Sequence, residues 1–318
     1  MQRHTPPPFK QWFPWLVPTF VVANVVLFII TMYINDCPKL SLHPASCFAS
    51  FLGRFSFQPL KQNPLLGPST YPSSDQIRKV YISKVYTVEM LVKLGALYVE
   101  YVVHLHQVWR LFASMWLHGG VVHLLLNMLG LLYFGIHLEK KFGYVRIGLL
   151  YIISGLGSSL LSGLFTQVTQ PSISIGASGA ICGLMGGLLS ELLTNWTIHP
   201  NKISELLIHL ANIILSLAFG ILPINVDNFG HIGGVISGFL LGFVLLIRPQ
   251  YKSDIPINFH PAPPVYKPYQ FGLLIISFVL LSAGLIGGMI LLLKEVNFND
   301  YCLWCHYLSC VPISKWKC

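Results

Sequence analysis

The sequence predicts an all-α membrane protein with a core of six transmembrane helices and a seventh helix added after a linker. Of its 318 residues, 54% are hydrophobic and 10% are charged, whereas about a quarter of the residues of a soluble domain are charged. Seven apolar runs also approach the roughly 20 residues that a helix needs to cross a bilayer. These runs cover residues 15–34, 119–138, 145–165, 177–193, 203–222, 229–247 and 271–293.

The runs divide the chain into five expected units. The first run is too long for the apolar part of a signal peptide and no small-residue cleavage site follows it, so we expect it to be retained as an anchor. The segment between the first two runs is too polar and proline-rich to span. The units are an N-terminal tail (1–14), a six-span core (15–248) that includes the long first loop (36–110), a proline-rich linker (249–270), a seventh helix (271–293) and a cysteine-rich tail (294–318).

The net charge of +9 indicates membrane topology rather than a nucleic-acid partner. The basic residues are spread over loops and form no arginine-rich face. Basic loops alternate with the uncharged loop 167–175 and with a loop containing Asp227, so the basic loops are predicted to be cytosolic. The N-terminus is then cytosolic, and the first loop and C-terminal tail are lumenal. The basic loops contain Lys140, Lys141 and Arg146, then Lys202, then Arg248, Lys252 and Lys267.

The positions of the cysteines agree with this topology. Six cysteines fall in predicted lumenal segments, and Cys182 falls in a span. Disulfides persist in oxidising compartments, so the pattern favours the secretory pathway. The sequence does not determine which of these cysteines pair with one another. The disulfide candidates are Cys37, Cys47, Cys302, Cys305, Cys310 and Cys318. The Cys-x-x-Cys-His pattern that ends at His306 also fits haem attachment or a zinc site, but four tail cysteines suit disulfides better.

Few strongly polar groups lie inside the spans, where their burial is costly and indicates function. His123 and Asn127 lie early in the second span, Ser178 opens the fourth and His231 opens the sixth. These three spans run in the same direction. All four polar groups are therefore expected at a similar depth on the lumenal side.

Glycines predict that two of these spans approach closely. Gly179, Gly183 and Gly187 recur every four residues in the fourth span, and Gly234, Gly238 and Gly242 do the same in the sixth. Stripes of this kind let helix backbones come into contact. If the stripes face each other, the Ser178 hydroxyl and the His231 imidazole come within hydrogen-bonding reach.

A paired serine and histidine can perform acyl transfer. Serine is a weak nucleophile until a base accepts its proton, so His231 would be the base and then the acid toward the leaving amine. His123, the Asn127 amide and the Ser178 N–H are candidate donors to the oxyanion. His118, at the mouth of the second span, is expected to stabilise structure by hydrogen bonding. Singly, each polar residue is more simply read as a packing or interfacial residue; the joint pattern indicates catalysis.

At these residues the sequence resembles the rhomboid intramembrane serine proteases, specifically the secretase-type rhomboid-like proteins of plants, over almost the whole chain. The matching motifs are Trp109-Arg110, then His118 with His123 and Asn127, then Glu139 with Gly143, then Gly176-Ala177-Ser178-Gly179, and His231 with Gly234 and Gly238.

The resemblance implies a serine endopeptidase whose dyad is Ser178 and His231, without a third acidic residue. His123 and Asn127 would surround the oxyanion, and Glu139 and Arg110 would brace the two faces. Neither a metal nor an organic cofactor is expected. The implied substrates are single-span membrane proteins, and the implied location is a Golgi or post-Golgi membrane. The sequence does not determine the oligomeric state.

Two departures from the family pattern suggest a second hypothesis. Gly230 stands where the family usually has alanine, which is expected to loosen packing beside the base, and residues 71–88 lengthen the first loop. A catalytically silent protein that binds transmembrane clients and controls their trafficking is the alternative. A transporter or channel is disfavoured because Glu139 and Glu191 fall near the ends of spans rather than within them.

Overall fold

A computed structural model describes residues 11–35, 50–56, 91–166, 173–221, 226–251, 264–302 and 304–308. Within these residues, six helical segments are long and apolar enough to cross a membrane, and α9 is a shorter apolar helix. The long elements are α1 (Leu16–Asn35), α6 (Val121–Gly130) with its continuations η4 (Leu131–Gly135) and α7 (Ile136–Phe142), α8 (Tyr144–Phe165), α9 (Ser178–Thr194), α10 (Lys202–Ile221), α11 (Asn228–Leu245) and α12 (Pro268–Leu293).

The predicted fold class is confirmed, because each of the seven apolar runs falls on one of these helices. The main difference concerns the second run, expected over 119–138. Its helix continues to Phe142, through a π-helical segment at Leu131–Gly135. The seventh helix also begins at Pro268, three residues before the expected start, because a proline fits the first turn of a helix.

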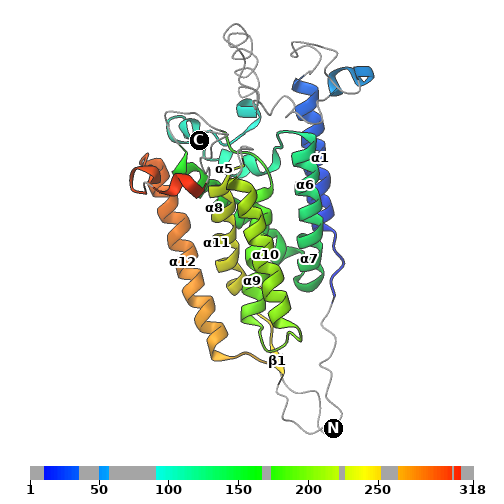
Figure 1. The fold of residues 1–318 in the computed structure, drawn as a ribbon, viewed down its shortest axis with the longest axis vertical. Coiled ribbons are helices and arrows are strands. Elements are labelled where there is room, and N and C mark those ends of the chain that lie inside the picture. The colour runs from blue at the N-terminus through cyan, green and yellow to red at the C-terminus, as the bar shows by residue number, and fades with distance from the viewer. Residues whose placement is uncertain are drawn as a thin grey trace.

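The described ends of the predicted linker form a small antiparallel pairing that the sequence did not predict. Strands β1 (Gln250–Tyr251) and β2 (Pro264–Val265) pair in register, Gln250 with Val265 and Tyr251 with Pro264. The pairing lies at the end of the bundle where α12 begins (Figure 1). It brings the start of α12 back to the bundle.

The described part of the first loop forms short elements over the predicted lumenal end. They are η2 (Ser50–Phe55), α4 (Val99–Val103), α5 (Arg110–Ala113) and η3 (Ser114–Trp116). Arg110, 3% exposed, donates to the carbonyl oxygens of Val92 and Ala96, and its guanidinium lies 4.8 Å from the Trp109 ring centroid. Arg110 therefore braces this loop, as the resemblance implied. Cys37, Cys47 and the segment 71–88 lie outside the described residues.

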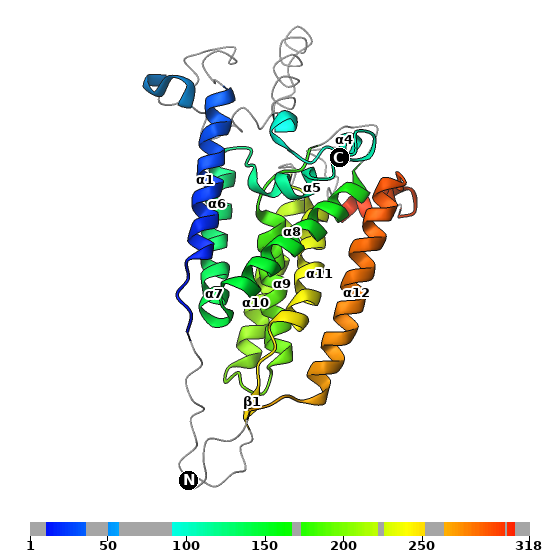
Figure 2. The ribbon, with the colours of Figure 1, turned by 180° about the vertical axis from the view of Figure 1, so that it is seen from behind.

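The centre of the bundle is a three-helix unit of α8, α9 and α11, seen from both sides in Figures 1 and 2. The predicted glycine stripes of α9 and α11 face each other. A Cβ atom on Gly183 would lie 3.3 Å from the Gly234 carbonyl oxygen, and one on Gly238 would overlap the Gly183 carbonyl. The two backbones are in direct contact, so the predicted close approach is confirmed.

Serines fill the notches that the glycines leave. Ser154 and Ser158 of α8 lie against Gly183 and Gly179 of α9, at the positions where Cβ atoms would otherwise stand. Ser237 of α11 occupies the corresponding place at Gly157 of α8. Small side chains thus set the spacing of all three helices.

Glu139 fixes the start of the first helix. Its buried carboxylate accepts hydrogen bonds from the backbone N–H groups of Trp15, Leu16 and Val17 at 2.8–2.9 Å. The first N–H groups of a helix have no partner within the helix, and the helix dipole favours a negative charge there. The expected bracing role of Glu139 is therefore exerted on a helix terminus.

A buried ion-pair cluster joins α7, α9 and α10 at the predicted cytosolic end. Glu191, 1% exposed, lies 3.0 Å from Lys141 Nζ and 3.3 Å from His199 Nε2. The other imidazole nitrogen of His199 lies 2.6 Å from Glu205. Glu191 therefore sits in a paired environment outside the predicted lumenal half of the bundle.

The glycine contact predicts a sharp difference between two glycine-to-alanine substitutions. Gly238→Ala places a methyl group against the Gly183 backbone. It should lower the free energy of unfolding by about 1–3 kcal/mol and lower the unfolding temperature accordingly. Gly284→Ala, in α12, meets nothing within 4 Å and should have no such effect. Thermal unfolding in detergent measures both. Equal stability of the two variants would contradict the backbone contact.

The ion-pair cluster around Glu191 predicts a pH-dependent stability. The hydrogen bond to Glu191 raises the pKa of His199 above its ordinary value, despite burial, with Lys141 and Glu205 as the neighbouring charges. Protonated His199 therefore stabilises the fold fully below about pH 6.5, and this contribution is lost as pH rises through the raised pKa. His199→Gln should flatten the decline of unfolding free energy in this range. If the unfolding free energy of His199→Gln fell with pH as steeply as that of the wild type, this role of His199 would be refuted.

Candidate active site

Ser178 begins helix α9 beneath the predicted lumenal surface. This helix has 17 residues and is therefore about 25 Å long at 1.5 Å per residue, less than the roughly 30 Å of a hydrocarbon core. The helix dipole and free N–H groups of its first turn are directed toward the chain that precedes Ser178. The hydroxyl thus lies at an electropositive helix terminus.

The turn before Ser178 is held from two sides. Gly176 has φ +123°, in a region that favours glycine, and its N–H donates to the Ser114 carbonyl at 3.0 Å. The next N–H, that of Ala177, points to His118 Nε2 at 3.4 Å. His118 is fully buried. His118 was expected to stabilise structure by hydrogen bonding, and in the structure its contact is with the turn before Ser178.

His231 lies in the first turn of α11 and is 6% exposed. Asp227 caps this helix, because its Oδ1 accepts from the Gly230 N–H at 2.8 Å. Its Oδ2 accepts from the Ser174 hydroxyl at 2.5 Å. Ser174 in turn pairs with Leu97 of the first loop through two backbone hydrogen bonds. Asp227 therefore ties the start of the histidine helix to the segment that leads into Ser178.

One cavity contains both residues of the predicted pair. Ser178 and His231 line it together with Ser158, Ser159, Ser174 and Asp227. The Nδ1 atom of His231 is buried and has no hydrogen-bond partner within the described part of the chain. The two side chains thus face a shared polar space rather than opposite sides of the bundle.

His123 and Asn127 lie on α6 beside the turn that precedes Ser178. A Cβ atom on Gly176 would come within 2.8 Å of the His123 ring and 3.5 Å of Asn127 Nδ2. The Asn127 amide nitrogen is buried without a partner in the residues described. Two side chains that can donate hydrogen bonds are therefore brought to the Gly176 segment, although they do not line the cavity itself.

Gly230 is explained by Asp227. The sequence suggested that the missing methyl group loosens packing beside the histidine, and this interpretation was wrong. A Cβ atom at position 230 would lie 2.6 Å from Asp227 Oδ2 and 3.1 Å from Ser158 Oγ. The space is filled by the Asp227 carboxylate and the Ser158 hydroxyl, so an alanine here would require one of these side chains to shift.

Sequence reasoning missed the parts of the site that surround the pair. It treated Asp227 only as a loop charge and did not single out Ser158 or Ser174. The four-residue spacing of Ser154 and Ser158, which matches the spacing of the glycines, was a usable signal. The contact between Ser174 and Asp227 joins residues 53 positions apart, and no local pattern indicates it.

The sequence is similar to known proteins over nearly its whole length. A model of the rhomboid domain matches residues 105–248. The chain is 55% identical to RHOMBOID-like protein 1 of Arabidopsis thaliana, over 98% of this chain and 75% of that protein. It is 48% identical to RHOMBOID-like protein 6, mitochondrial, of the same plant, over 97% and 95%. It is also 39% identical to Inactive RHOMBOID-like protein 8 from that plant, over 96% and 82%.

The double contact of Asp227 predicts distinct effects for two substitutions. Asp227→Ala removes both the cap of α11 and the bond to Ser174, and should lower stability by about 1–2 kcal/mol. Asp227→Asn keeps an oxygen for the Gly230 N–H and should lose less. Thermal unfolding in detergent, compared with Asp300→Ala in the C-terminal tail, tests this. A loss from Asp227→Asn as large as that from Asp227→Ala would contradict the capping role.

Proposed function

This chain belongs to the rhomboid family, and we propose that it is an active intramembrane serine endopeptidase with Ser178 as nucleophile and His231 as base. The observation that carries the proposal is the shared cavity, walled by both residues and positioned by two helices in backbone contact. Multi-pass insertion in a lipid bilayer follows from the fold; the catalytic roles are proposed.

The reaction would proceed by acyl transfer. His231 accepts the Ser178 proton as Oγ attacks the scissile carbonyl carbon, and it then returns the proton to the leaving amine. The Ser178 N–H, His123 and Asn127 are the proposed donors to the oxyanion. Water hydrolyses the acyl-enzyme in a second step. Serine hydroxyls on the cavity wall, including Ser158 and Ser159, support a place for that water.

The hydrogen bonds of Asp227 support a dyad rather than a triad. Both carboxylate oxygens accept from other groups, Gly230 N–H and Ser174 Oγ–H. His231 Nδ1, the atom that an orienting carboxylate would engage, has no partner among the described residues. Base orientation would then depend on the packing of α11 against α9.

The proposed substrates are single-span membrane proteins. A peptide bond in a helix is shielded by hydrogen bonds of the backbone, so a substrate must unwind near the site. Small or helix-breaking residues reduce the cost of unwinding. The position of Ser178 at the start of the short helix α9 supports cleavage within the lumenal half of the substrate helix.

We further propose a membrane of the secretory pathway, Golgi or post-Golgi, with the N-terminus in the cytosol. The basic loops at one end of the bundle and a disulfide between Cys302 and Cys305 at the other support this orientation. The name of one relative, RHOMBOID-like protein 6, includes "mitochondrial", so the mitochondrion is the competing location. Protease protection of a tag on each terminus in isolated membranes distinguishes the orientations.

A catalytically silent role in binding transmembrane clients is the second candidate. It is favoured by similarity to a relative whose name includes "inactive". The presence of both Ser178 and His231 in one cavity favours the active protease. The two candidates differ in a single measurable property, which is covalent reactivity of Ser178.

Labelling with a fluorophosphonate probe tests the proposed activity. The wild type should label, and Ser178→Ala and His231→Ala should lose at least about a thousandfold in labelling rate. Ser204→Ala, an exposed serine near the start of α10, is the matched control and should label like the wild type. Purified wild type should also cleave a single-span substrate in liposomes. Equal labelling of the wild type and Ser178→Ala would exclude the dyad.

A further inference from the structure

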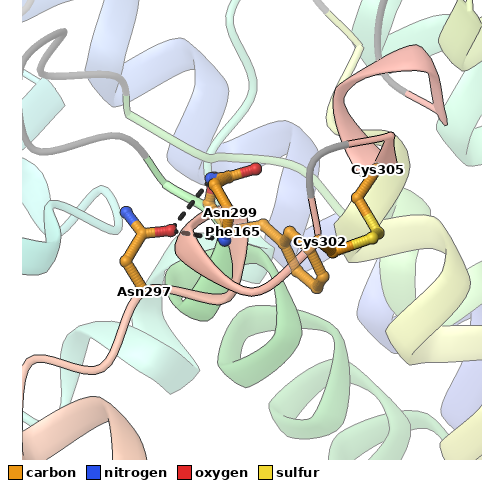
Figure 3. Close-up of a disulfide and its surroundings, with 5 residues drawn as sticks. All are labelled: Phe165, Asn297, Asn299, Cys302 and Cys305. Carbon is orange, nitrogen blue, oxygen red and sulfur yellow. Dashed lines mark hydrogen bonds between the residues drawn. A yellow bond between two sulfur atoms is a disulfide. The ribbon is translucent and has the colours of Figure 1, made fainter.

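The chain after α12 lies at the predicted lumenal end of the bundle (Figure 1), and Figure 3 shows its disulfide and neighbouring residues. It contains η5 (Phe298–Asp300), a disulfide between Cys302 and Cys305, and η6 (Cys305–Leu308). We refer to residues 297–302 and 304–308 as the clasp. The clasp lies outside residues 105–248, which match the rhomboid domain. Its contacts are therefore additions to the domain core.

The clasp holds the end of α8 by two amide hydrogen bonds. Asn299 Nδ2 donates to the Phe165 carbonyl at 2.7 Å, and Asn297 Nδ2 donates to the Thr166 carbonyl at 2.9 Å. The last carbonyl groups of a helix have no partner within the helix, so these bonds satisfy groups that would otherwise need water. The two asparagines are also bonded to each other, which fixes both amides (Figure 3).

The clasp contacts the first turn of α11 directly at Asn228 and indirectly through Phe165 of α8. Phe165 stacks on Phe229 with ring centroids 3.9 Å apart, and Phe298 packs edge-on against the same Phe165 ring at 5.5 Å. Asn228 Nδ2 donates to the Leu308 carbonyl. Phe229 and Asn228 precede His231 by two and three residues, less than one helical turn.

The disulfide makes these contacts a single unit. Cys302 follows η5, and its N–H donates to the Phe298 carbonyl at 3.0 Å; Cys305 begins η6 and is buried. The covalent link therefore joins the part of the clasp that holds α8 to the part that holds Asn228. Without it, the two parts would be joined by a short chain and by the hydrogen bond from the Cys305 N–H to the Cys302 carbonyl, and ordering that chain costs conformational entropy.

We propose that the clasp positions the base of the dyad by tying the first turn of α11 to the end of α8. This inference rests on the proposed function of His231. Helix ends fray, because their first N–H groups lack helical partners, and an imidazole in the first turn shares that motion. A displacement of about 1 Å is enough to reduce catalysis by as much as a hundredfold. Asn297, Asn299 and Phe298 are thus positioning residues, without contact to the reacting atoms.

The test compares substitutions within the clasp of the full-length protein in detergent or liposomes. The double variant Asn297→Ala/Asn299→Ala removes both bonds to α8, and Cys302→Ser/Cys305→Ser removes the covalent link. Tyr301→Ala is the matched control, because Tyr301 lies on the same segment and is 80% exposed. Hydrogen exchange of the peptide containing residues 228–232 reports the order of the first turn of α11 without using activity.

Both double variants should raise exchange of residues 228–232 several-fold and lower kcat about tenfold with KM little changed, because a misplaced base slows chemistry more than binding. Tyr301→Ala should match the wild type. Unchanged hydrogen exchange in both double variants would overturn the proposal that the clasp orders the first turn of α11. Raised exchange with unchanged kcat would overturn the proposal that this order positions His231. A wild type that neither labels nor cleaves would instead refute the proposed protease, while the exchange result would still decide whether the clasp orders α11.

Discussion

The direct contact between the backbones of α9 and α11 is the constraint on which the rest of the site depends. Gly183 and Gly238 meet where any side chain on the second would overlap the carbonyl of the first. Lipid provides little hydrophobic drive for association between helices, so van der Waals contact at short range must supply it. The same contact sets the lateral distance between Ser178 and His231, each within a turn of its glycine stripe. The contact that packs α9 against α11 therefore also determines the geometry of the proposed site.

Depth in the membrane is set by a different feature, the shortness of α9. With 17 residues, the helix is shorter than the roughly 30 Å hydrocarbon core, so its first residue is expected below the surface. The chain before it must then pass through the bundle as irregular backbone, which is tolerated at membrane depth only where protein or water satisfies its polar groups. Ser114, His118 and the Leu97 to Ser174 pairing do so here. A polar cavity with a half-buried serine on its wall thus follows from one short helix.

Much of this arrangement could be predicted from the sequence, because it depends on local periodicity. The seven apolar runs, the two glycine stripes and the shared depth of Ser178 and His231 are all patterns of spacing within single helices. The bond between Asp227 and Ser174, the carboxylate of Glu139 at the start of α1 and the contact of Asn228 with Leu308 join distant parts of the chain. Such contacts depend on the conformations of the loops that bring distant residues together. A hydropathy pattern does not predict these conformations.

Asp227 and Gly230 show how the neighbourhood of the histidine is coupled. The carboxylate caps the helix that carries His231, and a Cβ atom at position 230 would stand 2.6 Å from its Oδ2, so an alanine there would require the carboxylate to shift. Because Oδ2 also binds Ser174, a methyl group at 230 would disturb the segment before Ser178 as well as the start of α11. Gly230 therefore leaves no open gap beside the start of α11. The carboxylate beside it connects the segments bearing the proposed nucleophile and base.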